Sequence, residues 1–358
     1  MKHLFYPSLM FAAFCASTLL DWYSQNKRDL PWRHTKDPYL IWISEIILQQ
    51  TRVVQGYDYF LRFTQRFPDV RTLSSASEEE VLKYWQGLGY YSRARNLHAA
   101  AKSMRDGKFP STYAEVRALK GVGDYTAAAI CSLAYDMPCA VVDGNVYRVL
   151  ARYFGIDVPI DSTQGKKIFA EMAQEVLDKK QPAEYNQAIM DFGAMQCTPK
   201  NPGCMFCPLL ESCAAWAEKK VMQLPVKQHK VQTSNRYFNY LYVRMGKYVL
   251  LHKRTENDIW KNLYELPLIE TDCNLTETEF LASDTFRSLF AKDENPVVEI
   301  MQRDVKHILS HRVIYANFYG IELPEDSHSL ASYLRVELTD LENYALPRLI
   351  HAFFEKYR

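Results

Sequence analysis

Two carboxylate residues lie in sequence surroundings that would shift their pKa values in opposite directions. Glu45 shares one face of a predicted helix with Ile41 and Leu48, so we expect these apolar neighbours to raise its pKa. Asp143 follows an apolar run and precedes a predicted helix, whose free backbone N–H groups would lower the pKa of its carboxyl. A protonated acid beside an ionised carboxylate is the combination that cleaves glycosidic bonds. The alternatives are a solvent-facing or salt-bridged Glu45, and an Asp143 that only caps a helix.

A glycine-containing turn lies between two further predicted helices. The segment 119–124 joins predicted helices over residues 113–119 and 126–135. Gly121 and Gly123 would allow backbone N–H groups to approach a phosphate, because neither residue has a Cβ atom. This arrangement is the helix–hairpin–helix pattern of non-specific DNA binders. The alternative is an ordinary turn between two helices with a glycine cap.

Four of the eight cysteines fall within a short segment, whereas the other four are scattered along the chain. Four thiolates at such spacing hold a metal ion or an iron–sulfur cluster. The intervals of six, two and five residues depart from ordinary zinc-finger pairs and favour a cluster, with zinc or unrelated free thiols as alternatives. The clustered cysteines are Cys197, Cys204, Cys207 and Cys213.

Length and composition indicate a folded protein of about two domains. The chain has 358 residues, of which 48% are hydrophobic and 24% charged. The net charge of +1 combines +5 over residues 1–230 with −4 over residues 231–358, so only the first part suits an anionic partner. The apolar run 4–20 is too short for a membrane span, and we expect a helix there that continues to Tyr23. We therefore predict no membrane association.

Secondary-structure signals change in character after about residue 215. Helical patterns dominate residues 20–215, whereas strand patterns occur at 237–244, 248–253, 304–310 and 312–323. We predict a helical domain over residues 1–220, a linker over 221–235 and an α+β domain over 236–358.

These features together resemble the MutY-type adenine DNA glycosylases of the helix–hairpin–helix, iron–sulfur superfamily. The resemblance implies an all-α glycosylase domain with a [4Fe–4S] cluster loop, followed by an α+β Nudix-like domain. Members of this family remove adenine mispaired with 8-oxoguanine, and less well adenine opposite guanine. The resemblance therefore implies a monomer in the cytoplasm that binds double-stranded DNA containing such a mispair. It extends from about Leu19 to the C-terminus and is carried by the segments 30–33, 44–51, 87–91, 121–123, 142–146 and 190–194 and by the four clustered cysteines.

The resemblance also assigns roles to individual catalytic residues. Glu45 corresponds to the acid that protonates N7 of adenine, and Asp143 to the carboxylate that stabilises or transiently bonds the oxocarbenium sugar. Tyr125 and Asn145 would position these two groups. Relatives with lyase activity carry a lysine where this chain has Tyr125, so no Schiff base is expected there and we predict a monofunctional glycosylase. Lys120 is the nearest lysine in sequence.

Further residues would contact the DNA around the mispair. Gln50, Leu88 and Tyr90 match residues that enter the duplex and support extrusion of the adenine. Ser310 and His311 belong to a loop that would read 8-oxoguanine. In many relatives this loop is Phe-Ser-His, and Leu309 replaces the aromatic residue here, so any aromatic contact at that position is lost.

The C-terminal part lacks the metal-binding Nudix box. The segment 263–267 matches the C-terminal domain of the family, but no Arg-Glu-x-x-Glu-Glu core follows before Phe290, so pyrophosphate hydrolysis is not expected.

Two other functions compete with adenine excision. One is a pyrimidine-damage DNA glycosylase with lyase activity from the same superfamily, and the other is a non-catalytic iron–sulfur DNA-binding protein.

Overall fold

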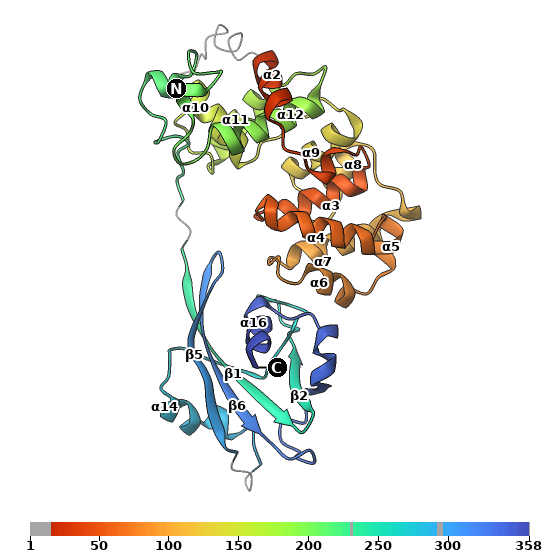
Figure 1. Ribbon diagram of the computed structural model, residues 1–358, viewed down its shortest axis with the longest axis vertical. Helices are drawn as coiled ribbons and strands as arrows, with labels where there is room; N and C mark the ends of the chain where they lie inside the picture. Colours follow the sequence, from red (N-terminus) through yellow and green to blue (C-terminus); the bar gives the residue numbers. More distant parts are fainter. Residues whose placement is uncertain (1–15, 230–231, 292–295, 358) are drawn as a thin grey trace. The chain divides into compact units, whose positions relative to one another are not determined.

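The computed structural model of the protein describes residues 16–229, 232–291 and 296–357 (Figure 1). These residues form two compact units, which we describe separately. The first unit comprises Met1–Ser75 and Asn96–Lys230, and the second comprises Ala76–Arg95 and Val231–Arg358. The N-terminal run that we expected to begin a helix lies largely outside the described residues, and the first described helix is α2 (Ala16–Asn26).

The first unit consists of helices in its described residues, as the sequence predicted. Several helices begin where a polar side chain caps the first turn. Asp37 accepts a hydrogen bond from the backbone of Tyr39, and Thr112 accepts one from the backbone of Glu115. The main helices after α2 are α3 (Pro38–Leu48), α4 (Val53–Arg66), α5 (Val70–Ser75), α7 (Ser92–Ser103, which begins in the second unit), α8 (Tyr113–Ala118), α9 (Asp124–Tyr135), α10 (Gly144–Phe154), α11 (Thr163–Val176), α12 (Pro182–Asp191) and α13 (Ala214–Ala217). Short helical turns are η1 (Pro31–Arg33), η2 (Arg105–Gly107), the π-helical η3 (Phe192–Gln196) and η4 (Cys204–Phe206).

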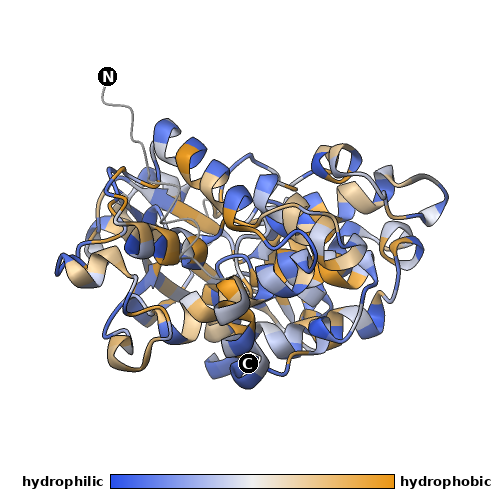
Figure 2. Ribbon diagram, turned by 90° about the horizontal axis from the view of Figure 1, so that it is seen from above, coloured by the Kyte–Doolittle hydropathy of each residue, from blue (hydrophilic) through white to orange (hydrophobic). Residues whose placement is uncertain are grey.

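Helix α9 occupies the centre of the first unit. It packs against α3 and α8, and also against α12, which in turn contacts α2 and α10. The helix is rich in alanine, and Ala127, Ala129 and Ile130 are fully buried. Small side chains allow neighbouring helices to approach closely, so residues from α3, α9, α10 and α12 can meet around one cavity. In Figure 2 many helices carry both orange and blue segments, the colouring of helices with one buried face.

The second unit contains a mixed seven-stranded sheet. The strand order is β3-β2-β1-β6-β5, with β4 paired to β1 and β7 paired to β2. The two long central strands, β1 (Ser234–Met245) and β6 (Arg312–Glu322), are parallel, and Ser234 pairs with Arg312 at the start of the register. The other strands are β2 (Tyr248–Lys253), β3 (Tyr264–Glu265), β4 (Leu268–Thr271), β5 (Val298–Ile308) and β7 (Leu334–Glu337).

Helices cover both faces of this sheet. Successive side chains of a strand point to opposite faces, and β6 shows this clearly. Phe318 stacks on Phe353 of α16 (Arg348–Tyr357) with ring centroids 4.4 Å apart. Its neighbour Tyr319 stacks on Phe280 of α14 (Glu277–Ala282) at 4.6 Å. A further short helix, α15 (Asp284–Arg287), packs beside α14, so the α+β architecture matches the prediction.

One helix of the second unit comes from an early part of the chain. Helix α6 (Glu78–Trp85) forms an ion pair from Glu79 to Lys253, and the hydroxyl of Tyr264 donates to the same carboxylate at 2.8 Å. Arg95 donates to the backbone carbonyl of Lys261 at 2.9 Å. The second unit is therefore discontinuous in sequence. The domain boundaries at residues 220 and 236 remain a prediction.

No helix among residues 16–229, 232–291 and 296–357 is both long enough and apolar enough to cross a membrane.

Candidate active site

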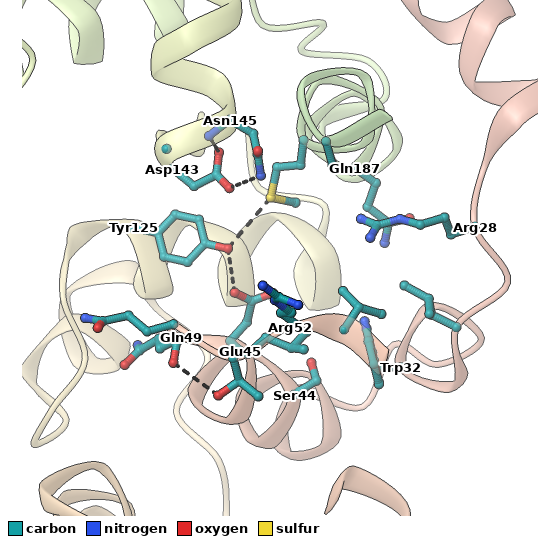
Figure 3. Close-up of a pocket in the computed structure, with 18 of the residues that line it drawn as sticks. Arg28, Trp32, Ser44, Glu45, Gln49, Arg52, Tyr125, Asp143, Asn145 and Gln187 are labelled. Carbon is teal, nitrogen blue, oxygen red and sulfur yellow. Dashed lines mark hydrogen bonds between the residues drawn. The ribbon is translucent and has the colours of Figure 1, made fainter. Parts of the chain in front are cut away.

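A cavity of about 650 Å³ opens between the helices of the first unit (Figure 3). Its lining combines carboxylate, guanidinium and amide groups from α3, α9, α10 and α12 with the segment before α3. Glu45, Asp143, Tyr125 and Asn145, the four residues predicted to be catalytic, all line it. The structure thus brings these residues together although they lie up to 100 positions apart in the sequence.

Glu45 is buried on α3, with only 7% of its surface exposed. Burial raises its pKa to about 7, and the nearby carboxylate of Asp143 acts in the same direction. The hydroxyl of Tyr125 donates a hydrogen bond to Glu45 Oε2 at 2.7 Å, which opposes these effects, as does the charge of Arg33. The expected rise in the pKa of Glu45 is confirmed. A carboxyl group with this pKa can carry a proton at neutral pH and give it up.

Asp143 caps helix α10 as predicted, but the predicted effect on its pKa is wrong. Its Oδ1 accepts from the backbone N–H groups of Asn145 and Val146, both at 2.8 Å, and its Oδ2 accepts from Asn145 Nδ2 at 2.8 Å. These bonds stabilise the ionised form, yet the pKa of Asp143 is raised because burial outweighs them. The sequence indicated the cap and gave no measure of how far the surrounding helices remove this carboxyl from water.

A chain of hydrogen bonds runs from Asp143 towards the cysteine segment. Asn145 accepts through Oδ1 from Arg148 Nη2 at 2.9 Å, and Arg148 Nε donates to the backbone carbonyl of Cys197 at 2.7 Å. Arg148 is itself 8% exposed, so this chain is largely screened from solvent. The orientation of Asn145, and through it of Asp143, therefore depends on where Cys197 lies.

The glycine hairpin joins α8 to α9 as expected. Gly121 has φ of +83°, and a Cβ atom there would lie 2.8 Å from Cβ of Asn96, so both conformation and packing require glycine. Gly123 is the N-cap of α9 and has open space around its Cβ position. The free backbone N–H groups at the start of α9 thus face an unobstructed surface. Arg117 fixes the turn by donating to the carbonyl of Val122 at 2.9 Å.

The four clustered cysteines lie in one folded segment, and their thiols affect one another's pKa values electrostatically. Burial raises the pKa of Cys207 to about 11, and the charges of the other three thiols act in the same direction. Arg152 Nη1 lies 3.4 Å from Cys197 Sγ, which places a positive charge beside this set of sulfurs. In the described part of the chain, no three His, Cys, Asp or Glu side chains already converge as ligands of a single metal ion. The donor set is chemically suited to thiolate-bound iron.

A second cavity, of about 570 Å³, lies in the second unit. Its lining includes Tyr90, Ser310 and His311, and the hydroxyl of Tyr90 is hydrogen-bonded to Ser310 Oγ. Leu88 does not point to solvent and is only 8% exposed, although the sequence predicted that it enters DNA. Gln50 belongs to the first unit and lines the cavity around Glu45.

Two of these predicted DNA-contacting residues have a strained backbone. Gln50 has φ of +58° and Tyr90 has φ of +47°. Residues other than glycine rarely adopt the left-handed conformation, and such strain is concentrated at functional sites. Both residues are also exposed, which suits side chains that meet an external ligand.

Two family models match the chain. Residues 43–176 match the HhH-GPD superfamily of base excision DNA repair proteins, and residues 239–356 match the NUDIX domain. An adenine DNA glycosylase of Buchnera aphidicola subsp. Baizongia pistaciae is 34% identical over 307 residues, covering 84% of each chain. The chain belongs to the adenine DNA glycosylase family. It is thus a DNA N-glycosylase of base excision repair, with a helix–hairpin–helix domain and a Nudix-like domain.

Other family members are similar in sequence, and solved structures are similar in fold. The adenine DNA glycosylase of Buchnera aphidicola subsp. Acyrthosiphon pisum is 30% identical over 95% of this chain and 96% of its own length. The adenine DNA glycosylase of Mus musculus is 42% identical, over 62% of this chain and 45% of the mouse protein. A thermostable thymine-DNA glycosylase matches 59% of this chain and 98% of its own, with a TM-score of 0.55 and 30% identity. Endonuclease III in a non-covalent DNA complex shares the fold with a TM-score of 0.51 at 20% identity, over 58% of this chain and 96% of its own.

Sequence reasoning did not identify two arginines that line the cavity around Glu45. Arg28 and Arg33 line the cavity beside Glu45, and both bind the carboxylate of Asp191. Two signals were available: Arg33 lies in the Leu-Pro-Trp-Arg segment and Asp191 in the Met-Asp-x-Gly segment. Neither signal reveals that the two segments meet, because 158 positions separate Arg33 from Asp191.

Replacing Glu45 by Gln should stabilise the protein at high pH. In the folded protein the pKa of Glu45 is about 7, above its ordinary value of 4.5, so its contribution to stability is complete below pH 4.5 and is lost as the pH rises through 7. Glu45→Gln removes this loss, and the free energy of unfolding should exceed that of the wild type by roughly 3 kcal/mol at pH 8 and by little at pH 4.5. Urea unfolding followed by far-UV circular dichroism measures the difference.

The matched control is Glu175→Gln on the exposed face of α11, which should not alter the pH dependence of unfolding. Equal pH dependence in the wild type and Glu45→Gln would show that Glu45 is not the group that titrates.

Proposed function

We propose that this protein excises adenine mispaired with 8-oxoguanine from duplex DNA, and more slowly adenine opposite guanine. The observation that carries the proposal is the buried Glu45, hydrogen-bonded to Tyr125 in the same cavity as Asp143. The curated relatives reported above are named adenine DNA glycosylases, which supports adenine as the base. Residues 1–220 would carry the cleavage chemistry, and residues 236–358 would read the opposite base.

Glu45 serves as the general acid. Adenine leaves poorly as an anion, and protonation at N7 makes it a neutral leaving group. Because the pKa of Glu45 is about 7, a substantial fraction of the enzyme holds the proton at neutral pH. The hydroxyl of Tyr125 at 2.7 Å fixes the direction in which this carboxyl points. The base must first leave the helical stack to reach the cavity, which costs a few kcal/mol.

Asp143 stabilises the positive charge that develops on the sugar as the base departs. Three hydrogen bonds, two from the backbone of α10 and one from Asn145 Nδ2, hold its two oxygens in place before the reaction. A carboxylate fixed in this way does not have to reorganise as the charge forms. Asn145 is in turn oriented by Arg148, so it acts as a positioning residue.

The second unit supplies the contacts to 8-oxoguanine. Ser310 and His311 line its cavity together with Tyr90 and offer hydroxyl and imidazole groups for hydrogen bonds to the oxidised base. Leu309 cannot provide the aromatic contact of the Phe-Ser-His loop. The hydrogen bond between Tyr90 and Ser310 would have to break or rearrange for Tyr90 to enter the duplex. Gln50 would act from the first unit.

The rate of adenine excision should depend on which base lies opposite the adenine. Single-turnover assays on duplexes with adenine opposite 8-oxoguanine, guanine or thymine should give fast, slower and little release of adenine. Glu45→Gln and Asp143→Asn should each lower the rate on the first duplex by on the order of 10²–10⁴-fold while DNA binding persists. His311→Ala should reduce the preference for 8-oxoguanine over guanine by up to about tenfold, because a hydrogen bond is lost.

Release of oxidised pyrimidines, with adenine left intact, would overturn the proposal. Full activity of Glu45→Gln would instead favour a different acid, or a protein that binds DNA without catalysis.

The cavity also argues against a lyase mechanism. A glycosylase that cleaves the strand uses an amine to form a Schiff base with the sugar. None of the described residues that line the cavity around Glu45 is a lysine, and Tyr125 occupies the position where lyases carry one. Lys120 is exposed on the hairpin and is not part of this lining.

Borohydride trapping should therefore yield little covalent protein–DNA adduct. The reaction is run with the wild-type protein and with Lys120→Ala, on DNA that contains the adenine substrate. Efficient trapping in the wild type would contradict a monofunctional mechanism, and its loss in Lys120→Ala would identify the amine.

We further infer that the cysteine segment holds a [4Fe–4S] cluster. Cys197, Cys204, Cys207 and Cys213 would be its ligands, and Arg152 would offset part of its negative charge. The cluster would supply structural cohesion to the loop, while Arg148 connects the backbone of Cys197 to Asn145. Backbone N–H groups of Leu209 and Trp216, which bond to Cys207 and Cys213, would favour the thiolate form of these ligands.

Cys207→Ser should lower bound iron and the visible absorbance of the purified protein. The same change should weaken DNA binding, because the loop is no longer held together. Cys273→Ser, an exposed cysteine of the second unit, is the control and should retain full iron content. Stoichiometric zinc without iron in the wild type would contradict the cluster.

A further inference from the structure

Asp191 is a buried carboxylate at the end of α12, bound by two arginine side chains. Its side chain is fully buried, and Arg33 donates from Nη1 to Oδ2 at 2.6 Å and from Nη2 to Oδ1 at 2.7 Å. Arg28 donates from Nε to Oδ1 at 2.9 Å. Burial acts to raise the pKa of Asp191, but the hydrogen bonds from Arg33 and Arg28 outweigh it and the pKa lies below its usual value. The residue is therefore a fixed negative charge.

The two arginines belong to the wall of the cavity that contains Glu45. Arg28 and Arg33 lie between α2 and α3, while Gln187 and Met190 of α12 form the adjacent wall. Asp191 is not in contact with the cavity and lies behind this wall. It thus fastens the segment before α3 to α12. Arg33 Nη1 also donates to the carbonyl of Arg28 at 3.1 Å, so the two arginines are bonded to each other as well as to Asp191.

Stability alone is a poor explanation for this cluster. Buried ion pairs are often no more stable than apolar residues of the same volume, although removing one partner is strongly destabilising. Because its two arginines line the cavity that contains Glu45, we expect the cluster to contribute to the reaction.

The cluster also sets the charge near the acid. Arg28 and Arg33 carry two positive charges and Asp191 one negative charge, so the net charge of the cluster is +1, and it would be +2 without Asp191. Arg33 already lowers the pKa of Glu45. The other charged or titratable groups that face Glu45 are Tyr125 of α9, Asp143 at the cap of α10, Arg52 before α4 and Arg148 of α10.

We propose that Asp191 is a positioning residue that fixes Arg28 and Arg33 in the cavity wall and limits the positive charge facing Glu45. The inference rests on the proposed function, in which Glu45 gives its proton to the base. Additional positive charge would favour the ionised form of Glu45, and less of the acid would be protonated at neutral pH.

The test is the pH profile of single-turnover adenine excision. In the wild type the rate should fall at high pH as Glu45 loses its proton. Asp191→Asn should move the midpoint of this fall to lower pH by roughly half to one unit. Asp136→Asn, which removes the same charge from an exposed ion pair with Lys36, should leave the midpoint in place.

Arg28→Gln provides a second test in which Asp191 keeps its pairing with Arg33. It removes one positive charge from the cavity wall and keeps Asp191 bonded to Arg33, so the midpoint should move to higher pH. A uniform loss of rate with unchanged midpoints in both variants would mean that Asp191 is only a structural clamp and would overturn the inference. Unimpaired excision by Glu45→Gln would instead reject the proposed function itself.

Discussion

The burial of one carboxyl group is the constraint on which the site depends. Glu45 lies buried on α3, and α9 is one of the helices that pack against α3. A buried carboxyl group retains its proton more tightly and needs a hydrogen-bond partner, and the first turn of α9 provides Tyr125. The alanine-rich sequence of α9 allows this close approach. Packing of the two helices therefore sets both the protonation and the direction of the acid.

Two aspartates of the same unit show how neighbours determine the outcome of burial. Asp143 is bonded to backbone N–H groups and an amide, and burial still raises its pKa. Asp191 is bonded to two guanidinium groups, and its pKa is lowered. Dipoles hold a carboxylate in place, whereas full positive charges also compensate for lost hydration. Asp143, the less stabilised of the two, is the carboxylate that faces the cavity.

Local sequence signals were sufficient to locate most helices. Asp143 caps a helix where predicted, because a cap requires only residues a few positions apart. Strand β2 was predicted at its observed bounds. Helix α12 ends at Asp191, where the chain changes to a π-helical turn within the region predicted to be helical. Asp191, the last residue of α12, binds arginines far away in the sequence, and no local pattern reports such contacts.

The candidate site was predicted less completely than the helices. Glu45 and Asp143 were recognised from their surroundings and from family motifs, and the structure places them in one cavity. The rise in the pKa of Asp143 and the cluster around Asp191 could not be foreseen. Both depend on how segments far apart in the chain exclude water or bring charges together.

The discontinuity of the second unit has a consequence for how the protein is made. Glu78 and Glu79 of α6 bind Asn262, Lys253 and Tyr264 of the C-terminal part. During synthesis α6 leaves the ribosome long before these partners, so it must wait until the segment 253–264 has emerged. The first and last thirds of the polypeptide thus complete the second unit together, and a ribosome that stalls before residue 253 leaves Glu78 and Glu79 of α6 without these partners.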